Sequence, residues 1–404
     1  QVALSGGVKV HFIDHAGYFH RPGIYGGSHG DYSDNLNRYS FFCREVLSEV
    51  RRKQLRPDFL HAHDWPAALS IIYLKTGKPD RQLAKTRTVF TIHNLAYQGR
   101  FPKGQYLKLG LPKRHLPGGQ RGQFSSPVNL LKGALLFSES LTTVSPTYAR
   151  EIQTPAYGEG LERLLRRRSR DLVGILNGID MKSWNPRTDS TIPFRYDDRR
   201  LAVKRKNKAL LQKELGLGVE PRTLLIGMVN RLVSQKGLDL VTRTWPKLKG
   251  LKVQLAILGS GDRASERSLK QAESLSDTMR VRLGFNESLS RRIYAGADAF
   301  LMPSRYEPCG LGQMIAMRYG AVPIVRKTGG LADTVRESRG PGNEGNGFCF
   351  APYSSAALGR VLGRALKVYE NPEAWSRLQR RGMRTDFSWD RSAREYLRLY
   401  ESLS

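Results

Sequence analysis

The sequence predicts an α/β fold of two domains, each built on a parallel β-sheet that helices cover on both faces. Two observations indicate this fold: β-branched or apolar runs alternate with helical stretches along the chain, and a polar break divides the runs into two series. The length of 404 residues is enough for two hydrophobic cores. We therefore expect one domain on each side of the break.

The first series of strands ends before residue 183, and each strand runs into polar or small residues. These strands are predicted over residues 9–13, 58–63, 87–93, 141–145 and 171–176. The polar break covers residues 183–200 and contains two prolines. The second series is predicted over residues 223–229, 252–258, 280–285, 298–303 and 322–327. Because ligands of open α/β sheets bind at the carboxyl ends of strands, we expect a site where the strand ends of both domains face a cleft.

Polar motifs follow three strands of the first series. HAHDW spans residues 61–65, TIHNLAYQG spans residues 91–99 and LNGID spans residues 176–180. A lone histidine at a strand end is more often a structural group than a functional one. Three polar strand ends along one edge of a sheet nevertheless favour a site.

Two cations follow the first strand of the second series, in the motif NRLVSQKG. Arg231 and Lys236 are five residues apart across a strand-to-helix turn, so both can reach one diphosphate. Two solvated surface cations are the ordinary alternative. The motif GSGD at residues 259–262, which ends the next strand, favours the phosphate interpretation.

The most informative segment covers residues 303–331, PSRYEPCGLGQMIAMRYGAVPIVRKTGGL. A strand ends in a turn around Glu307, a helix starts near Gly310, and a second strand opens into a TGG turn at residues 328–330. Helix N-termini and glycine loops attract phosphate because their N–H groups have no internal partner. A carboxylate beside them implies a ligand that is part phosphate and part polyol, and a nucleotide sugar fits that description.

The chain is strongly basic, with 66 lysines and arginines against 36 aspartates and glutamates and a formal net charge of +30. This balance favours polyanionic partners. The basic clusters are scattered and lack the aromatic interleaving or zinc spacing of nucleic-acid modules, so we expect no specific nucleic-acid partner. No apolar run approaches the roughly 18 residues of a membrane span, so we expect no membrane partner. Three cysteines are too few for a disulfide framework or a zinc site, and they indicate a reducing compartment.

Taken together, the motifs resemble those of bacterial glycogen synthases and plant-type starch synthases, the ADP-glucose-dependent α-1,4-glucan synthases among the GT-B glycosyltransferases. Eight motifs occur in family order between residues 58 and 335: HAHDW, FTIHNLAYQG, TTVSPTYAREI, ILNGID, NRLVSQKGLDL, LGSGD, PSRYEPCGL and MRYGAVPIVRKTGGLADTV. The resemblance implies two Rossmann-like domains, residues 1–182 on the acceptor side and 183–387 on the nucleotide-sugar side, whose sheets face an interdomain cleft. It also implies a C-terminal helix over residues 388–404 that returns to the first domain.

The resemblance also implies roles for residues that match the family motifs. Arg231 and Lys236 would bind the ADP phosphates, and Glu307 would face the transferred glucose. His93 would contact the glucose 6-hydroxyl and shield the reacting centre. Asp64 and Asn177 would line the sugar side, and Tyr25 would lie near the acceptor channel. The full set of other expected substrate-binding residues is Tyr25, Asp64, Asn94, Asn177, Gly259, Phe285, Cys309, Gly310, Leu311, Thr328, Gly329 and Gly330.

The implied reaction moves glucose from ADP-glucose to the non-reducing end of glycogen, starch or a maltooligosaccharide, with retention of the α configuration. ADP is the leaving group, so cations are needed where charge develops on the β-phosphate oxygen. The sequence contains no D-x-D metal motif, so Arg231, Lys236 and a helix N-terminus would do this electrostatic work, and we expect no metal or other cofactor. The resemblance implies the cytoplasm of a bacterium, or the plastid stroma of a plant or alga.

The chain departs from the family pattern in several places. The family's N-terminal Lys-x-Gly-Gly-Leu loop is absent and Ser5-Gly6-Gly7 is not its equivalent, which implies a chain that lacks about 70 residues at its start. Phe285 stands where some members have a tyrosine beside the adenine, and Gly312 replaces a threonine or asparagine. Ile315, eight residues after Glu307, replaces the second glutamate of the broader glycosyltransferase signature.

Two other functions stay open. A non-catalytic glucan-binding homologue would bind maltooligosaccharides without releasing ADP, and the missing loop favours it. A polyanion-binding protein is suggested only by the charge of +30. An ADP-release assay separates the first from a glucan synthase, and a nucleic-acid shift at physiological salt would favour the second.

Overall fold

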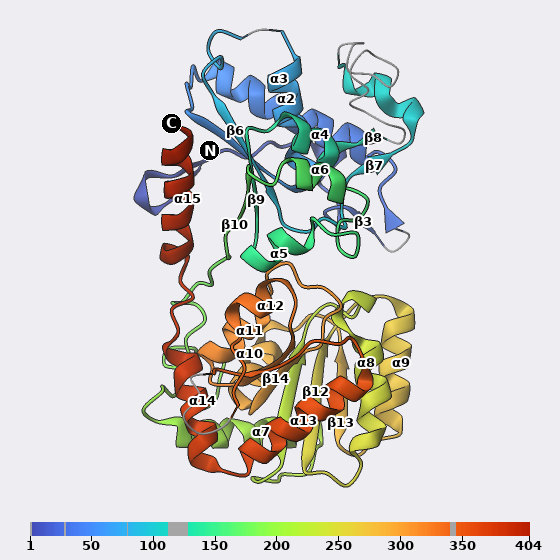
Figure 1. Cartoon of the computed structure of the whole chain (residues 1–404), viewed down its shortest axis with the longest axis vertical. Coiled ribbons are helices and arrows are strands. Elements are labelled where there is room, and N and C mark those ends of the chain that lie inside the picture. Colours follow the sequence, from blue (N-terminus) through green and yellow to red (C-terminus); the bar gives the residue numbers. More distant parts are fainter. Residues whose placement is uncertain (1, 28–29, 79, 112–127, 340–344) are drawn as a thin grey trace. The chain divides into compact units, whose positions relative to one another are not determined.

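The computed structural model describes residues 2–27, 30–78, 80–111, 128–339 and 345–404, and the chain forms two compact units. Unit 1 consists of Gln1–Thr143, Glu151–Val173 and Arg398–Ser404. Unit 2 consists of Val144–Arg150 and Gly174–Leu397. Each unit contains its own parallel sheet (Figure 1).

Unit 1 is built, within the described residues, on a four-stranded sheet with the strand order β10-β9-β6-β5. β6 pairs in parallel with β5 on one side and β9 on the other, and α3 packs against β5 and β6 and between α2 and α4. The strands are β1 (Val2–Ala3), β2 (Lys9–Val10), β3 (Gly26–Gly27), β4 (Gly30–Asp31), β5 (Phe59–His63), β6 (Arg87–Ile92), β7 (Arg100–Phe101), β8 (Val128–Asn129), β9 (Ser140–Thr143) and β10 (Leu172–Gly174). The helices are α1 (Ala16–Phe19), α2 (Asn35–Arg52), α3 (Asp64–Thr76), α4 (Leu130–Phe137), α6 (Glu162–Arg167) and the 3₁₀ segments Ser5–Gly7 and Lys103–Leu109.

Unit 2 is built on a six-stranded sheet with the order β13-β12-β11-β14-β15-β16, and all its neighbouring strands run parallel. The strands are β11 (Leu224–Val229), β12 (Val253–Gly259), β13 (Met279–Leu283), β14 (Ala299–Met302), β15 (Val322–Arg326) and β16 (Phe348–Phe350). The longer helices are α7 (Lys204–Leu215), α9 (Arg263–Ser274), α10 (Glu287–Gly296), α13 (Ser355–Tyr369) and α14 (Pro372–Arg384). A further long helix, α15 (Trp389–Leu403), begins in unit 2, and its residues from Arg398 onward belong to unit 1. The shorter ones are α5 (Pro146–Glu151), α8 (Leu238–Thr244), α11 (Gly312–Arg318), α12 (Gly329–Thr334) and the 3₁₀ segments Leu201–Val203, η5 (Ser234–Lys236) and Trp245–Leu248.

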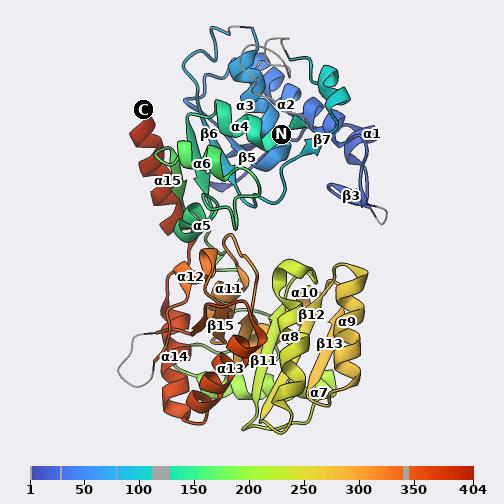
Figure 2. The same cartoon turned by 45° about the vertical axis from the view of Figure 1, so that its right-hand side comes forward.

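Side chains of β11 alternate between the two faces of this sheet. Leu224, Ile226 and Met228 join the core cluster that contains residues of α8 and α13. Leu225 joins the cluster formed with α7 and α10 on the other face. Both faces are therefore covered, as a parallel sheet requires. Figure 2 shows α9 beside the edge strand β13 and α14 on the opposite side of the sheet.

Every strand predicted from residues 58–63 onward is present in these two sheets, with bounds that differ by at most two residues. This confirms the predicted α/β class with parallel sheets. The helix expected to start near Gly310 begins at Gly312 as α11, and the helix predicted over residues 388–404 is α15. Sequence reasoning missed β16, which pairs in parallel with β15.

The strand predicted over residues 9–13 is wrong as a member of the parallel series. Only Lys9–Val10 is a strand, and it pairs antiparallel with Val2–Ala3. Gly6 and Gly7 in the connecting turn have φ values of +81° and +80°, which glycine adopts readily. Such a local turn suffices for antiparallel pairing, whereas parallel pairing needs a crossover of a dozen or more residues.

No described helix combines the length and the apolar character that crossing a membrane requires. The three cysteines are all free thiols: Cys43 and Cys309 are buried, and Cys349 is partly buried.

Candidate active site

A buried ion pair joins two loops at the carboxyl ends of the neighbouring strands β11 and β14 of unit 2. Lys236 Nζ lies 2.6 Å from Glu307 Oε2, and the two side chains are only 12% and 7% exposed. Lys236 ends η5, which follows β11, whereas Glu307 lies in the loop that follows β14. Ser304 Oγ also donates to Glu307 Oε2, at 2.9 Å. A cation and a hydroxyl therefore hold the carboxylate away from most of the solvent.

The two loops also meet through their main chains. Arg305 N donates to the carbonyl of Gln235 at 2.8 Å. Gly237 has a φ of +71°, and a Cβ at this position would lie 2.1 Å from the carbonyl oxygen of Pro303. Only glycine fits there without displacing the loop of Glu307. The motif SQKG thus supplies both the lysine and the close approach that brings it to the carboxylate.

Gly329 and Gly330 let α12 approach the same loop. A Cβ on Gly329 would lie 1.9 Å from the carbonyl oxygen of Glu307, and one on Gly330 would lie 2.0 Å from that of Cys309. The N–H of Gly330 donates to the carbonyls of Glu307 and Pro308, both at 3.1 Å. This N–H is thus used within the protein, and a role for the two glycines in phosphate binding stays a prediction.

Cys309 and Asn177 are neighbours in unit 2. Burial raises the pKa of the Cys309 thiol to about 12, although the sulfur accepts a hydrogen bond from the main-chain N–H of Asn177. Gly310 follows with a φ of +73°. Leu311 is 45% exposed, and Thr328, before α12, is fully buried.

The remaining predicted residues of unit 2 lie at the carboxyl ends of three neighbouring strands. Arg231 follows β11 and is exposed, Gly259 ends β12, and Phe285 comes two residues after β13. The Phe285 side chain is 91% exposed, so its aromatic face is open to solvent. Because parallel strands end at one edge of a sheet, these residues share an edge with the ion pair of Lys236 and Glu307.

Unit 1 carries a cluster of histidines at the ends of β5 and β6. His63 Nδ1 lies 3.0 Å from His93 Nε2, and the rings of His61 and His63 stack with their centroids 4.3 Å apart. The main-chain N–H of His93 donates to Asp64 Oδ1 at 2.8 Å. Asp64 has a φ of +57°, a left-handed conformation that is uncommon outside glycine but that aspartate adopts more readily than most residues.

Tyr25 and Asn94 complete the predicted residues of unit 1. The Tyr25 ring lies 5.7 Å from that of Trp65, and burial together with the charge of Asp64 raises the pKa of Tyr25. Asn94 Oδ1 accepts from Ala96 N at 3.1 Å, which fixes the turn after β6. In the part of the chain that the structure describes, no group of three or more His, Cys, Asp or Glu side chains is placed to hold a metal ion.

Burial moves the pKa values of the histidine cluster and of Asp64 in opposite directions. Desolvation lowers the pKa of His61 to about 3 and that of His63 to about 4, and it lowers the pKa of His93. Desolvation raises the pKa of Asp64 to about 6, against hydrogen bonds from the main-chain N–H groups after β6. The histidines are therefore neutral at pH 7, and Asp64 carries most of its charge.

The stability of unit 1 should consequently fall as the pH is lowered below about 6.5. Unfolded His61 binds a proton near its ordinary pKa of 6.5, whereas folded His61 resists it down to about 3, so stability is lost across this window. Protonation of Asp64 should raise the stability between about pH 6 and pH 3.8, but this single group is outweighed by the loss from the three histidines. We expect the melting temperature, followed by circular dichroism, to drop from pH 7 to pH 4.5, and to drop less in His61→Gln.

The matched control is His20→Gln, which replaces an exposed histidine of the same unit. Its melting temperature should fall with pH as steeply as that of the wild type. An equally steep fall in His61→Gln would show that the buried imidazole is not the group responsible.

Sequence reasoning missed the residues that support the Glu307 loop and α12. Arg326 Nη1, at the end of β15, donates to the carbonyls of Ser304 and Arg305 at 3.3 and 2.5 Å. Thr147 donates through its N–H and its hydroxyl to the carboxylate of Asp333, at 2.8 and 2.6 Å. The last two residues lie in the motifs TTVSPTYAREI and LADTV, but 186 positions separate them, so spacing alone gave no sign that they pair.

Two family models match the chain. Residues 1–167 match the model described as starch synthase catalytic domain, and residues 214–381 match the model described as glycosyl transferases group 1. Glycogen synthase of Geotalea daltonii is 47% identical over 395 residues, which are 97% of this chain and 81% of that protein. Glycogen synthase of Thermotoga maritima is 46% identical over 397 residues, which cover 98% of this chain and 80% of that protein.

Solved structures show the same similarity. The catalytic domain of starch synthase IV from Arabidopsis thaliana, bound to ADP and acarbose, has a TM-score of 0.85 and 38% identity, over 92% of this chain and 78% of that chain. Sucrose-phosphate synthase from Thermosynechococcus elongatus has a TM-score of 0.60 and 17% identity, over 93% of this chain and 80% of that chain. At 17% identity, the similarity to sucrose-phosphate synthase supports the fold alone.

Proposed function

The chain belongs to the glycogen synthase and starch synthase family of GT-B glycosyltransferases, and we propose its reaction on that basis. It transfers glucose from ADP-glucose to the non-reducing end of an α-1,4-glucan, with retention of the α configuration. The donor assignment rests on the motifs of the ADP-glucose branch and on the ADP in the similar starch synthase structure.

The buried pair of Lys236 and Glu307 is the observation that best supports this proposal. A carboxylate and an ammonium group lie 2.6 Å apart at one edge of the sheet, beside the close-approach glycines Gly329 and Gly330. Removing either partner would leave a charge that is nearly excluded from water, which is costly. A diphosphate sugar suits such a pair because its phosphates offer the lysine a second anion and its sugar offers the carboxylate hydroxyl groups.

Lys236 and Arg231 would supply the positive charge that the leaving group needs. Negative charge develops on the β-phosphate oxygen as the glycosidic bond breaks, and a fixed cation close to that oxygen lowers the barrier. Glu307 would face the sugar, where a carboxylate stabilises the oxocarbenium character of the transition state. Ser304 keeps one carboxylate oxygen hydrogen-bonded while Lys236 exchanges partners.

On the acceptor half, His93 would contact the glucose 6-hydroxyl and shield the reacting centre. The lowered pKa of its imidazole keeps it neutral, so it can donate or accept without adding charge. Asp64 would line the sugar side, and Tyr25 would lie near the acceptor. Asn177, which belongs to unit 2, would also line the sugar side. His63 supports this arrangement, since its ring nitrogen fixes His93 Nε2 at 3.0 Å.

Glucose incorporation into glycogen tests the proposal directly. Radiolabelled ADP-glucose and UDP-glucose are compared as donors, and we expect a higher kcat/KM with ADP-glucose. Phe285→Ala should lower kcat/KM for ADP-glucose by about fivefold and affect UDP-glucose less, because a flat aromatic face stacks better on adenine. Leu275→Ala, which replaces another exposed apolar side chain of unit 2, should change neither donor. A preference for UDP-glucose would overturn the donor assignment and leave the family intact.

The relatives compared above are named as synthases, which gives the non-catalytic glucan-binding alternative no support. The same assay separates the two functions. A chain that binds maltooligosaccharides but releases no ADP from ADP-glucose would be a binding protein.

A further inference from the structure

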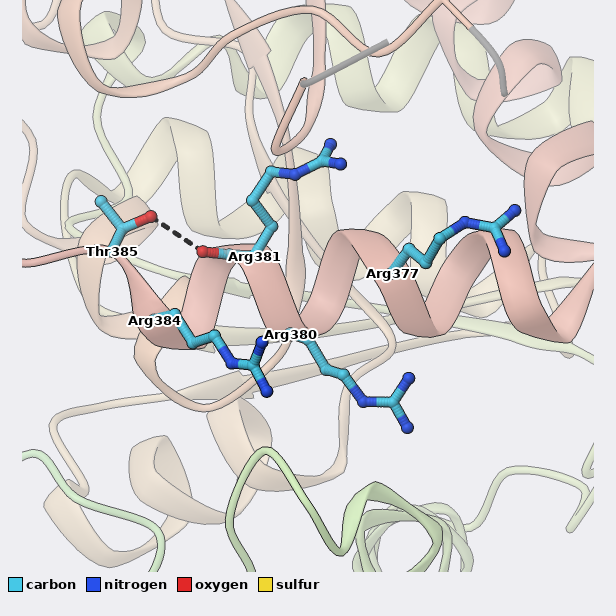
Figure 3. A pocket seen from close by; sticks show the side chains of 5 residues that line it. All are labelled: Arg377, Arg380, Arg381, Arg384 and Thr385. Atoms are coloured by element: carbon cyan, nitrogen blue, oxygen red, sulfur yellow. Dashed lines mark hydrogen bonds between the residues drawn. The ribbon is translucent and has the colours of Figure 1, made fainter. Parts of the chain in front are cut away.

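Four arginines line a hollow on α14, in a part of unit 2 that the proposed reaction does not use. The hollow measures about 440 Å³, a size that suits a small molecule. Figure 3 shows the four arginines on this one helix, with Arg377 and Arg381 on one side and Arg380 and Arg384 on the other. Thr385 closes the end of the helix, where its hydroxyl donates to the Arg381 carbonyl at 2.9 Å. The lining residues that the structure describes include no aromatic ring, so they offer charge rather than stacking.

The spacing of these arginines concentrates positive charge on one stripe of the helix. They follow an i, i+3, i+4, i+7 pattern, which places neighbours about 5–6 Å apart at Cβ. The opposite face of α14 is buried through Trp375, Leu378 and Met383. Like charges at these spacings destabilise a helix by about 0.2–0.5 kcal/mol per pair. A bound anion would relieve this repulsion.

Of the described partners of three of these arginines, only the Asp198 carboxylate lies close enough to neutralise one of them, Arg384. Arg384 Nε pairs with Asp198 Oδ2 at 2.7 Å, while Arg380 Nε donates to the main-chain carbonyl of the same residue at 3.2 Å. Arg377 lies 3.7 Å from Glu373, whose side chain is 88% exposed. A carbonyl cancels no charge, and an exposed pair at that distance contributes little.

The helix dipole does not account for the stripe. Cations stabilise the last turn of a helix, and Arg381 and Arg384 occupy that turn of α14. Arg377 and Arg380 lie before it, where the favourable effect has faded. The helix dipole therefore does not stabilise the charges of these two arginines, whereas a bound anion would.

The hollow and the ion pair of Lys236 and Glu307 lie at opposite edges of the sheet of unit 2. Gln379 Nε2, on α14, donates to the carbonyl of Gly320 at 2.8 Å, just before β15 begins. The ion pair lies beyond the carboxyl ends of β11 and β14. A strand as long as β15, with five residues, spans roughly 16 Å, so one ligand of that hollow would not reach the reaction site.

We propose that Arg377, Arg380, Arg381 and Arg384 form a second anion site on unit 2 that binds a small compound with adjacent phosphate groups. Guanidinium groups bind phosphate in a bidentate manner, and several arginines on one helix face can each bind a different phosphate group of one compound. Because the described lining residues offer no ring for a base to stack on, they favour a compact phosphate compound over a stacked nucleic acid. The proposal stands apart from the proposed reaction and uses none of its residues.

Tripolyphosphate is the probe, titrated into the full chain by calorimetry at low and at physiological salt. Arg377→Gln/Arg380→Gln should weaken its binding by about tenfold or more, since it removes two guanidinium groups and spares the ion pair of Arg384 and Asp198. Arg377→Lys/Arg380→Lys should give an intermediate loss, because it keeps the charge and removes the fork. The matched control, Arg391→Gln/Arg394→Gln, removes two exposed arginines at the same spacing on α15 and should bind like the wild type. Melting temperatures check that all variants are folded.

Lys236→Ala is titrated in parallel, because tripolyphosphate could also bind at the donor edge. Binding that Lys236→Ala retains and Arg377→Gln/Arg380→Gln loses belongs to the hollow, whatever becomes of the proposed reaction. Equal affinities in the wild type and the arginine variant would overturn the proposal, and so would equal losses in the arginine variant and its control. A 20-nucleotide single strand that displaces tripolyphosphate from the hollow at physiological salt would overturn it in favour of a nucleic-acid site.

Discussion

Glu307→Gln is expected to lower glucose incorporation into glycogen by about 100-fold or more, with little change in ADP binding. The substitution keeps the size of the side chain and an oxygen that can accept from Ser304, but it removes the charge that would stabilise the oxocarbenium character of the sugar. ADP binds through its phosphates and base, neither of which would need this carboxylate. Initial rates with ADP-glucose and glycogen, together with an ADP titration, measure both effects.

A structural role for Glu307 makes a different prediction. Glu307→Gln leaves Lys236 buried and unpaired, which costs about 3–5 kcal/mol, so both roles predict a lowered melting temperature, and only the catalytic role predicts a loss of rate in protein that is still folded. Glu214→Gln is the matched control, since Glu214 pairs with Arg292 at 2.7 Å in the same unit but is 39% exposed. Activity of Glu307→Gln within about threefold of the wild type would remove this residue from the catalytic role.

The parallel architecture could be predicted because the strands of unit 2 are short, apolar and regularly separated by helical stretches. Buried strands such as β11 and β12 need largely apolar sequences; Asn230 follows β11, and Gly259 is the last residue of β12. The hairpin of β1 and β2 could not be predicted in this way, because residues 9–13 have the composition of a buried strand. Two glycines at positive φ form the turn that makes this pairing antiparallel, and the pattern of apolar residues does not indicate such a turn.

The sequence motifs single out candidate site residues one by one, but they do not show which of these residues are partners. Lys236 and Glu307 were expected to face phosphate and sugar separately, whereas the structure pairs them across 71 residues. Gly237 makes that approach possible, and its role follows from the position of Pro303 and from nothing in its own segment. His63 and Arg326 are similar cases, since their contacts depend on strand order. The arginine hollow on α14 was not predicted, because its residues are spread over one helix face and resemble an ordinary solvated surface.

Lys236→Ala is expected to lower kcat/KM for ADP-glucose by about 100-fold or more, the largest loss we expect from any single cation of this chain. Lys236 is nearly buried beside Glu307, whereas Arg231 is exposed, so less water screens the charge of the lysine. Lys270→Ala is the matched control, because Lys270 also lies 2.7 Å from a glutamate of unit 2 but is 46% exposed. Its kcat/KM should stay within about twofold of the wild type.

A double variant separates the electrostatic role of Lys236 from the cost of stranding its partner. Lys236→Ala leaves Glu307 buried and unpaired, so its melting temperature should fall. Lys236→Ala/Glu307→Gln removes both charges, and we expect it to regain much of the lost stability but none of the lost activity. Recovery of transfer in the double variant would show that Lys236 serves mainly to hold Glu307.

The D-x-D motif is absent from the sequence, so EDTA should leave the wild-type rate within about twofold. A rate that collapses with EDTA and returns with Mn²⁺ would transfer the neutralisation of the diphosphate from Lys236 to a metal ion.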